Sequence, residues 1–180
     1  MIRSFFIVCF IICCFFAKAQ HTSRKEIAVK GLQATFSASV LTAYQENAKE
    51  KIEDLFQYLQ LLSDTDVSED LKKEVEKNIY ILFKDREVLL PDFFNDAKNQ
   101  IKLSSLIERL KKSSLKFTLL DVVDGPILLD SWQTNYKLQI FNKDEVQSLS
   151  LSQTIYLSNE VKIFGKYAKN VWQIRLGAVK

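Results

Sequence analysis

The chain has 180 residues, of which 47% are hydrophobic and 26% are charged, and its formal net charge at neutral pH is +3. This length is enough for one domain with a substantial hydrophobic core. The small net charge gives no indication of a nucleic acid or an anionic membrane as a partner.

The N-terminal residues have the pattern of a secretory signal peptide. Arg3 supplies a positive charge, residues 5–17 form an apolar run, and an A-x-A motif ends at Ala19. The apolar run has the length found in signal peptides and is shorter than the roughly 20 residues that a membrane span needs. The sequence therefore predicts a signal peptide over residues 1–19, cleavage between Ala19 and Gln20, and export to the periplasm or the medium.

Composition limits the chemistry of the exported part. All three cysteines lie within the predicted signal peptide, and the single histidine is His21, close to the new N-terminus. We therefore expect no disulfide, no catalytic Cys–His or Ser–His pair, no metal site and no bound cofactor. An exported domain without disulfides is typical of a bacterial envelope protein. A lipid anchor on Cys13 or Cys14 is the alternative to soluble export, but neither follows the small residue that a lipoprotein signal requires.

The first half of the domain is predicted to be helical. Apolar residues at spacings of three and four predict an amphipathic helix over residues 40–62. A second helix is predicted to begin at Asp66, because Asp66 and Glu69 have the spacing of a capping box. A short apolar segment interrupted by Pro91 predicts an edge strand or a covering loop, and residues 101–110 predict a third helix.

Beyond the third helix the pattern becomes that of β-strands. Apolar and polar residues alternate, as expected for strands with one buried face. A turn is predicted at residues 158–160, and a lysine-bearing loop is predicted over residues 165–170. The predicted strands span residues 115–123, 132–140, 146–157 and 171–179.

Helices followed by antiparallel strands predict an α+β fold. We expect N-terminal helices packed on one face of a curved antiparallel sheet of about four to six strands. A flexible leader is predicted over residues 20–37, and a single domain is predicted over residues 38–180.

The order of elements resembles the nuclear transport factor 2-like superfold, in which a cone of sheet wraps around helices. The resemblance covers residues 38–179 and is carried by the long first helix and by the closing strand, residues 171–177, with Trp172 near its start. A cystatin-like arrangement has a similar order of elements. The resemblance implies a pocket at the open end of the cone, and members of the superfold include isomerases, dehydratases, transport adaptors and exported binding domains. Its enzymes mostly use a buried His or Asp, and the predicted domain contains no His.

Four aromatic residues of the predicted strands are the candidate lining of such a pocket. Aromatic side chains with polar tips suit an apolar ligand, although at alternate strand positions they also form ordinary core. The four residues are Trp132, Tyr136, Tyr156 and Trp172.

Three carboxylates, Asp121, Asp124 and Asp130, lie near the end of the first long strand and its turn. A buried carboxylate with a raised pKa could act as a general base, and Asp121 is the candidate if the protein is an enzyme. Turn chemistry at Asp124-Gly125 and solvated strand ends explain the same residues without catalysis.

Basic and aromatic residues alternate near the C-terminus. Stacking on nucleic acid bases is one use of such a pattern, but a solvated hairpin loop or contact with an anionic envelope polymer fits an exported protein better. The residues are Lys162, Phe164, Lys166, Tyr167, Lys169, Trp172 and Arg175.

The sequence thus favours an exported, non-enzymatic binding or assembly domain. Its predicted partner is a small apolar ligand or another protein at the open end of the cone, with neither nucleic acid nor a membrane span involved. The alternative is a lyase or isomerase of the same superfold that uses a buried Asp or Glu as its base. A homodimer formed through the sheet face is a further expectation.

Overall fold

The structure is a computed structural model that describes residues 36–95, 99–143 and 145–180. The chain divides within its first described helix, between Leu41 and Thr42. The unit from Thr42 to Lys180 holds all the other elements. The predicted signal peptide, its cleavage site at Ala19 and Gln20, and the predicted leader up to residue 35 lie outside the described residues.

The described elements confirm the predicted α+β class, since helices precede long strands and pack against them. A four-stranded antiparallel sheet is accompanied by a small two-stranded one. In chain order the elements are α2 (Ala38–Ser63), α3 (Glu69–Leu82), β1 (Leu89–Pro91), β2 (Gln100–Lys102), α4 (Leu103–Leu110), β3 (Lys116–Asp124), β4 (Ser131–Asn142), β5 (Glu145–Phe164) and β6 (Tyr167–Val179).

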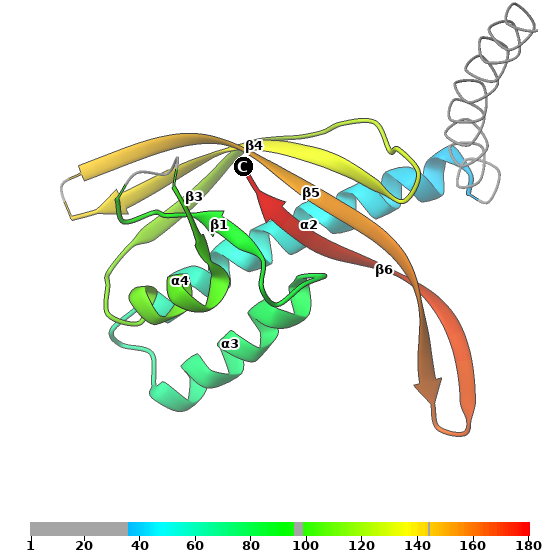
Figure 1. The fold of residues 1–180 in the computed structure, drawn as a ribbon, viewed down its shortest axis with the longest axis horizontal. Helices are drawn as coiled ribbons and strands as arrows, with labels where there is room; N and C mark the ends of the chain where they lie inside the picture. The colour runs from blue at the N-terminus through cyan, green and yellow to red at the C-terminus, as the bar shows by residue number, and fades with distance from the viewer. Residues whose placement is uncertain (1–35, 96–98, 144) are drawn as a thin grey trace, which may run out of the picture. The chain divides into compact units, whose positions relative to one another are not determined.

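The large sheet is a simple meander in the order β3-β4-β5-β6, and every neighbouring pair is antiparallel (Figure 1). Its two faces differ in burial, as strand geometry requires. In β4 the side chains at alternate positions from Trp132 to Ile140 are buried, and those between them are exposed or half-buried. The buried face is covered by the helices, which lie together on one side of the sheet (Figure 1).

The core forms between that face and the apolar stripe of α2. Ile52, Leu55 and Leu59 recur at helical spacing and are fully buried. Each large side chain buried in this way contributes roughly 1.5–3 kcal/mol relative to exposure in water. Helix α4 adds four fully buried positions on one short helix, Leu103, Leu106, Ile107 and Leu110.

A chain of buried polar groups crosses the centre of the sheet. The Tyr136 hydroxyl on β4 lies 3.2 Å from Oε1 of Gln153 on β5, and Nε2 of Gln153 lies 3.4 Å from the carbonyl oxygen of Gly177 on β6. Burial raises the pKa of Tyr136, so its hydroxyl stays protonated and donates. Strands β4, β5 and β6 are therefore linked by side-chain hydrogen bonds as well as by backbone pairing.

Gly177 is required where β5 and β6 change register. The pairing shifts between Gln153 and Ile155, and a Cβ on Gly177 would lie 2.6 Å from Cε2 of Tyr156 and 3.1 Å from the Thr154 carbonyl oxygen. Because the second contact is with backbone, any larger residue at this position would displace a strand.

Two predicted helix starts are wrong. Helix α3 begins at Glu69 with Ser68 as its N-cap, because the Ser68 hydroxyl accepts from the Leu71 N–H and the Asp66 N–H instead donates to the Asp64 carboxylate. The third helix begins at Leu103, since Gln100–Lys102 pair with β1 as a strand.

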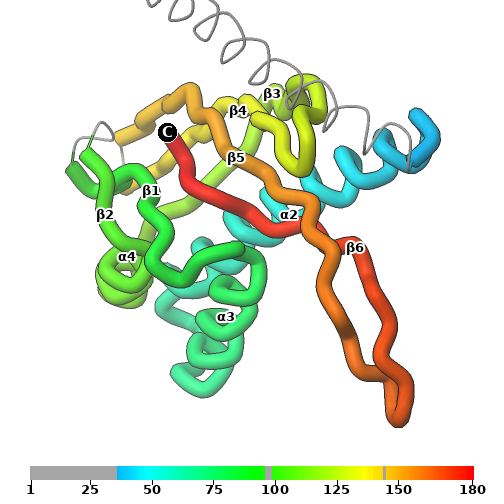
Figure 2. Tube along the Cα trace, turned by 45° about the vertical axis from the view of Figure 1, so that its right-hand side comes forward, coloured from blue at the N-terminus to red at the C-terminus, as the bar shows by residue number. Residues whose placement is uncertain are grey.

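The predicted turn at residues 158–160 is also wrong, as is the loop over residues 165–170. Strand β5 continues through these positions to Phe164, and β6 begins at Tyr167. The two strands pair without a break from Leu157 to Phe164 (Figure 2). Pairing with β6 thus overrides the turn preference of Ser158, Asn159 and Glu160.

No helix among residues 36–95, 99–143 and 145–180 has both the length and the apolar character that a membrane crossing demands.

The packing of α3 predicts a difference between two isoleucines on opposite faces of one helix. Ile79 is fully buried, whereas Ile81 is 59% exposed. We expect Ile79→Ala to lower the free energy of unfolding by about 2–5 kcal/mol, because it leaves a cavity. The matched control, Ile81→Ala, should change it by no more than about 0.5 kcal/mol. Urea denaturation followed by circular dichroism measures both, and equal losses would contradict the packing described here.

Candidate functional site

Strand β3 is an open edge of the large sheet. Among the described strands it pairs only with β4. The opposite edge strand, β6, is covered over part of its length, because the Lys84 N–H donates to the Leu176 carbonyl and the Gln100 side chain donates to the Val179 carbonyl. The free edge of the sheet beside the helices is therefore that of β3.

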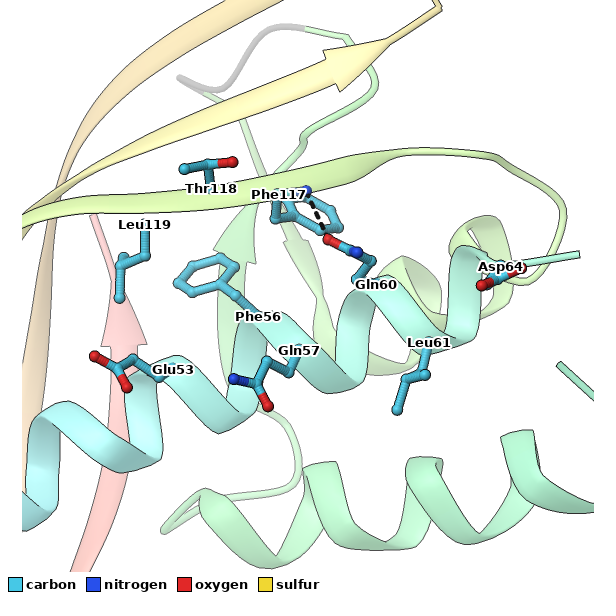
Figure 3. A pocket seen from close by; sticks show the side chains of 9 residues that line it. All are labelled: Glu53, Phe56, Gln57, Gln60, Leu61, Asp64, Phe117, Thr118 and Leu119. Carbon is cyan, nitrogen blue, oxygen red and sulfur yellow. Dashed lines mark hydrogen bonds between the residues drawn. The ribbon is translucent and has the colours of Figure 1, made fainter. Parts of the chain in front are cut away.

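The direction of the free backbone groups follows from one hydrogen bond. The Phe117 N–H points away from β4 and donates to Oε1 of Gln60 on α2 over 3.2 Å (Figure 3). In an antiparallel strand both backbone polar groups of alternate residues point to the same side. Pairing with β4 is regular from Lys116 to Leu120, so the N–H and carbonyl groups of Leu119 also point outward.

A groove runs between this edge and the C-terminal half of α2. Its volume is about 550 Å³. Figure 3 shows Leu119 pointing from β3 toward α2, with Glu53 and Phe56 below it on the helix. The lining residues are Glu53, Phe56, Gln57, Gln60, Leu61, Asp64, Phe117, Thr118 and Leu119.

The floor of the groove is aromatic and fixed by packing. The rings of Phe56 and Phe117 lie with their centroids 6.0 Å apart. Phe56 also contacts the buried Tyr136 edge-on at 5.7 Å, and Phe117 contacts Phe93 at 5.7 Å. Such offset and edge contacts hold the rings in one arrangement, so the groove is preformed.

The rim of the groove is acidic and polar. Glu53 and Asp64 are exposed, and neither forms an ion pair with another described residue. Gln57 is exposed between them, one helical turn from Glu53. The groove therefore offers an apolar floor, backbone hydrogen-bonding groups and two carboxylates that form no ion pair with the described residues.

The four predicted pocket-lining aromatics do not gather around this groove. Trp132 and Tyr136 are buried on the helix-facing side of β4. Tyr156 lies on the opposite face of the sheet, where the Lys84 ammonium stands 4.0 Å above its ring. Trp172 is half-buried near the base of the β5–β6 hairpin. Their proposed role in a shared pocket stays a prediction.

The three predicted carboxylates occupy different environments. Asp121 is exposed at a bulge of β3, with φ of 52°, and forms an ion pair with Lys137 over 2.8 Å. Asp130 is exposed in the following loop. The side chain of Asp124 is buried, and its carboxylate accepts from Nε1 of Trp132 at 3.1 Å and from the Thr134 hydroxyl at 2.5 Å. Asp124 thus ties the end of β3 to the start of β4.

A buried carboxylate that sequence reasoning missed is Asp92, which follows β1. Both of its oxygens accept from Nη1 of Arg109, at 2.8 and 2.9 Å. Burial alone would raise the pKa of Asp92, but hydrogen bonds from Arg109, from the Phe94 N–H and from the Asn95 amide together lower it below its usual value. Asp92 is therefore held ionised and acts as a structural anchor.

In the described part of the chain, no three His, Cys, Asp or Glu side chains are placed to share an ion. Every deeply buried side-chain nitrogen or oxygen described has a hydrogen-bond partner.

No family model, curated protein or solved structure matches this chain. The groove beside β3 is consequently assigned as the candidate site from its geometry alone.

One signal in the sequence could have indicated the groove. Glu53, Gln57 and Gln60 on α2 and Asp64 directly after it recur at spacings of three and four. These polar residues form a second stripe directly beside the buried apolar stripe of the helix. That position distinguishes the second stripe from the fully solvated side of the helix. The free edge of β3 has no such signal, because strand order follows from the whole topology.

The Asp92–Arg109 pair predicts a pH dependence of stability. Because the pKa of Asp92 is lower in the folded than in the unfolded state, its stabilisation is present above the ordinary carboxyl pKa of about 3.9 and is lost as the pH falls below it. We expect Asp92→Asn to lower the free energy of unfolding by about 1–3 kcal/mol near pH 7, with the difference shrinking toward pH 3. The matched control is Asp121→Asn, which removes an exposed ion pair and should have little effect at either pH. Urea denaturation at several pH values tests this, and a deficit in Asp92→Asn that does not change with pH would contradict it.

Proposed function

We propose that the chain is an exported, non-enzymatic binding domain that takes up an extended, basic segment of a partner protein along the edge of β3. The observation that carries the proposal is the open edge beside a preformed groove on α2. An added strand would pair with the outward backbone groups of Leu119, a mode of peptide recognition known as β-strand addition.

The side chains of an added strand would alternate between two environments. Those on the helix-facing side would enter the groove over Phe56 and Phe117, where apolar side chains are removed from water. Basic side chains near its ends would reach Glu53 and Asp64 on the rim. Backbone pairing would supply affinity, and the groove would supply a preference for apolar residues flanked at the ends by basic residues that face the same side of the strand.

A partner protein fits this site better than a small apolar ligand. The groove is open along its length rather than enclosed. Besides an apolar floor, it presents backbone hydrogen-bonding groups and carboxylates. The resemblance to the nuclear transport factor 2-like superfold is consistent with an exported binding domain and stays a prediction, as does a homodimer through the sheet face.

The alternative of a lyase or isomerase has less support from the described carboxylates. Asp121, the candidate base, is exposed and paired with Lys137. Asp92 and Asp124 are buried, but each is held by several donors and neither lines the groove. A general base needs a raised pKa and a free lone pair facing a substrate.

The proposal is tested by selecting displayed random peptides of about ten residues on the full chain. Enrichment of apolar residues at alternate positions, with basic residues at the ends of the same row, is expected from the lining of the groove. The affinity of a selected peptide is then measured on Leu119→Pro, which removes the outward N–H of β3 while leaving its pairing with β4 intact. We expect a loss of at least about tenfold, the effect of roughly 1.4 kcal/mol.

A matched control distinguishes the site from a general effect of proline. Val146 on β5 has the same parity as Ser152, whose N–H points away from β4 toward Lys180, so Val146→Pro places proline at an outward position remote from the groove. This variant should bind the peptide as the wild type does. Equal binding by wild type and Leu119→Pro, or selection of peptides without basic residues, would refute the proposal.

A further inference from the structure

The end of the β5–β6 hairpin projects away from the rest of its unit. Figures 1 and 2 both show the two strands extending beyond the helices. All ten residues from 161 to 170 are exposed. The turn has two residues, and Gly165 adopts φ of 62° at the first central position, as in type II′ turns. The hairpin is thus a regular, paired structure whose tip contacts nothing else described.

The tip is apolar on both of its faces. Directly opposed residues of an antiparallel pair lie on one face, so Phe164 and Tyr167 share one face and Ile163 lies on the other. These side chains are 53%, 74% and 78% exposed. Val161, next along the same face as Ile163, is 68% exposed. Four large apolar side chains that are exposed together usually mark a surface that binds a partner, a ligand or a membrane.

Three lysines lie among these apolar residues, with Lys166 in the turn itself and Lys162 and Lys169 two pairs behind it. Residues 161–170 contain Lys162, Lys166 and Lys169 and no acidic residue. Lys162 and Lys169 are directly opposed across the two strands, an arrangement that destabilises a hairpin in isolation. None of the three forms an ion pair within the described chain, and Glu160, the acidic residue that directly precedes this segment, is paired with Arg175 at 3.0 Å.

Positive potential continues to the base of the hairpin. Burial lowers the pKa of Lys51 on α2, and the nearby charges of Arg175 and Lys162 lower it further. The small net charge of the chain therefore conceals a local concentration of cations at one end of the sheet.

We propose that the tip of the β5–β6 hairpin inserts into the surface of an anionic lipid bilayer. Apolar side chains enter the boundary between headgroups and acyl chains, and the lysines contact lipid phosphates. From Val161 to Phe164 the strand advances roughly 10 Å, at about 3.3 Å per residue, which matches the depth of interfacial insertion.

A bilayer can contact both apolar faces of the tip and its lysines, whereas other partners can contact only some of these groups. A protein surface would cover one face of so thin a hairpin and leave either Ile163 or the Phe164–Tyr167 pair in water. A soluble anionic polymer would bind the lysines and leave the apolar tip exposed. A bilayer surrounds both faces and is complementary in charge. This surface is separate from the groove beside β3, so the two proposals stand independently.

The experiment places an environment-sensitive dye on the full chain. Cys9, Cys13 and Cys14 are replaced by Ser, and a single cysteine is introduced by Ala168→Cys at the hairpin tip. The matched control carries the dye at Gln147→Cys, an exposed position near the other end of β5. Vesicles containing phosphatidylglycerol are compared with vesicles of phosphatidylcholine alone.

We expect a blue shift of the dye at position 168 with anionic vesicles and none at position 147. Replacement of Lys162, Lys166 and Lys169 by Gln should weaken partitioning on the order of 100-fold, since each lysine near an anionic surface contributes about a fivefold increase. Phe164→Ser should abolish the blue shift while leaving circular dichroism unchanged, because its side chain is exposed in the free protein.

Several outcomes would overturn the proposal. The dye at position 168 would remain in an aqueous environment with both kinds of vesicle, or the shift would be the same with uncharged lipid. Binding to soluble polyphosphate without any shift on vesicles would assign the hairpin to an anionic polymer instead. Because the apolar N-terminal residues 5–17 are present in every variant, vesicle binding that is unaffected by the hairpin substitutions would also refute it.

Discussion

The burial of one stripe of α2 against the sheet is the constraint on which the rest of this structure depends. Ile52, Leu55, Leu59 and Leu62 are fully buried, and their spacing fixes which side of the helix faces the strands. The neighbouring stripe, with Glu53 and Gln60, is then carried to the edge of β3. The candidate site is therefore a geometric consequence of core packing, since no additional element is needed to place it.

The same constraint accounts for the contrast between the two ends of the sheet. Near α2 the inner face of the strands is covered, and Trp132, Leu138 and Ile155 are buried. Beyond the helices β5 and β6 continue as a pair with no covering layer. Both faces of this part of the sheet are therefore exposed, and neither needs to be the apolar one. Apolar side chains at the tip, such as Ile163 and Phe164, consequently remain in contact with solvent.

Local patterns predicted the elements that are stabilised by local periodicity. The helix over residues 40–62 and the strand over residues 132–140 agree with α2 and β4 because their apolar spacing matches one face of one element. The strand β2 and the outer half of the hairpin were missed for the opposite reason. Ile101 continues the helical spacing of the residues that follow it, and Ser158–Glu160 favour a turn, but pairing with a distant segment overrides both preferences.

The candidate site was predictable only in part. Composition already excluded histidine and cysteine chemistry from the predicted domain, and the structure shows Asp121 in an exposed ion pair and Asp124 bonded to Trp132 on β4. The groove and the Asp92–Arg109 pair depend on contacts between residues far apart in the chain, which no spacing rule contains.

The buried chain from Tyr136 through Gln153 to Gly177 has a consequence for the uniqueness of the fold. Strand β5 alternates regularly between small hydroxyl residues and apolar ones, so a slip of two residues against β4 would preserve which side chains face the core. Hydrophobicity alone barely opposes such a slip. A slip that places Gln153 opposite Trp132 would, however, separate the Gln153 amide from the Tyr136 hydroxyl, and the buried hydroxyl would lose its hydrogen-bond partner at the usual cost of about 1–3 kcal/mol. A single glutamine in an otherwise apolar row thus opposes an alignment of the strands that burial alone would accept.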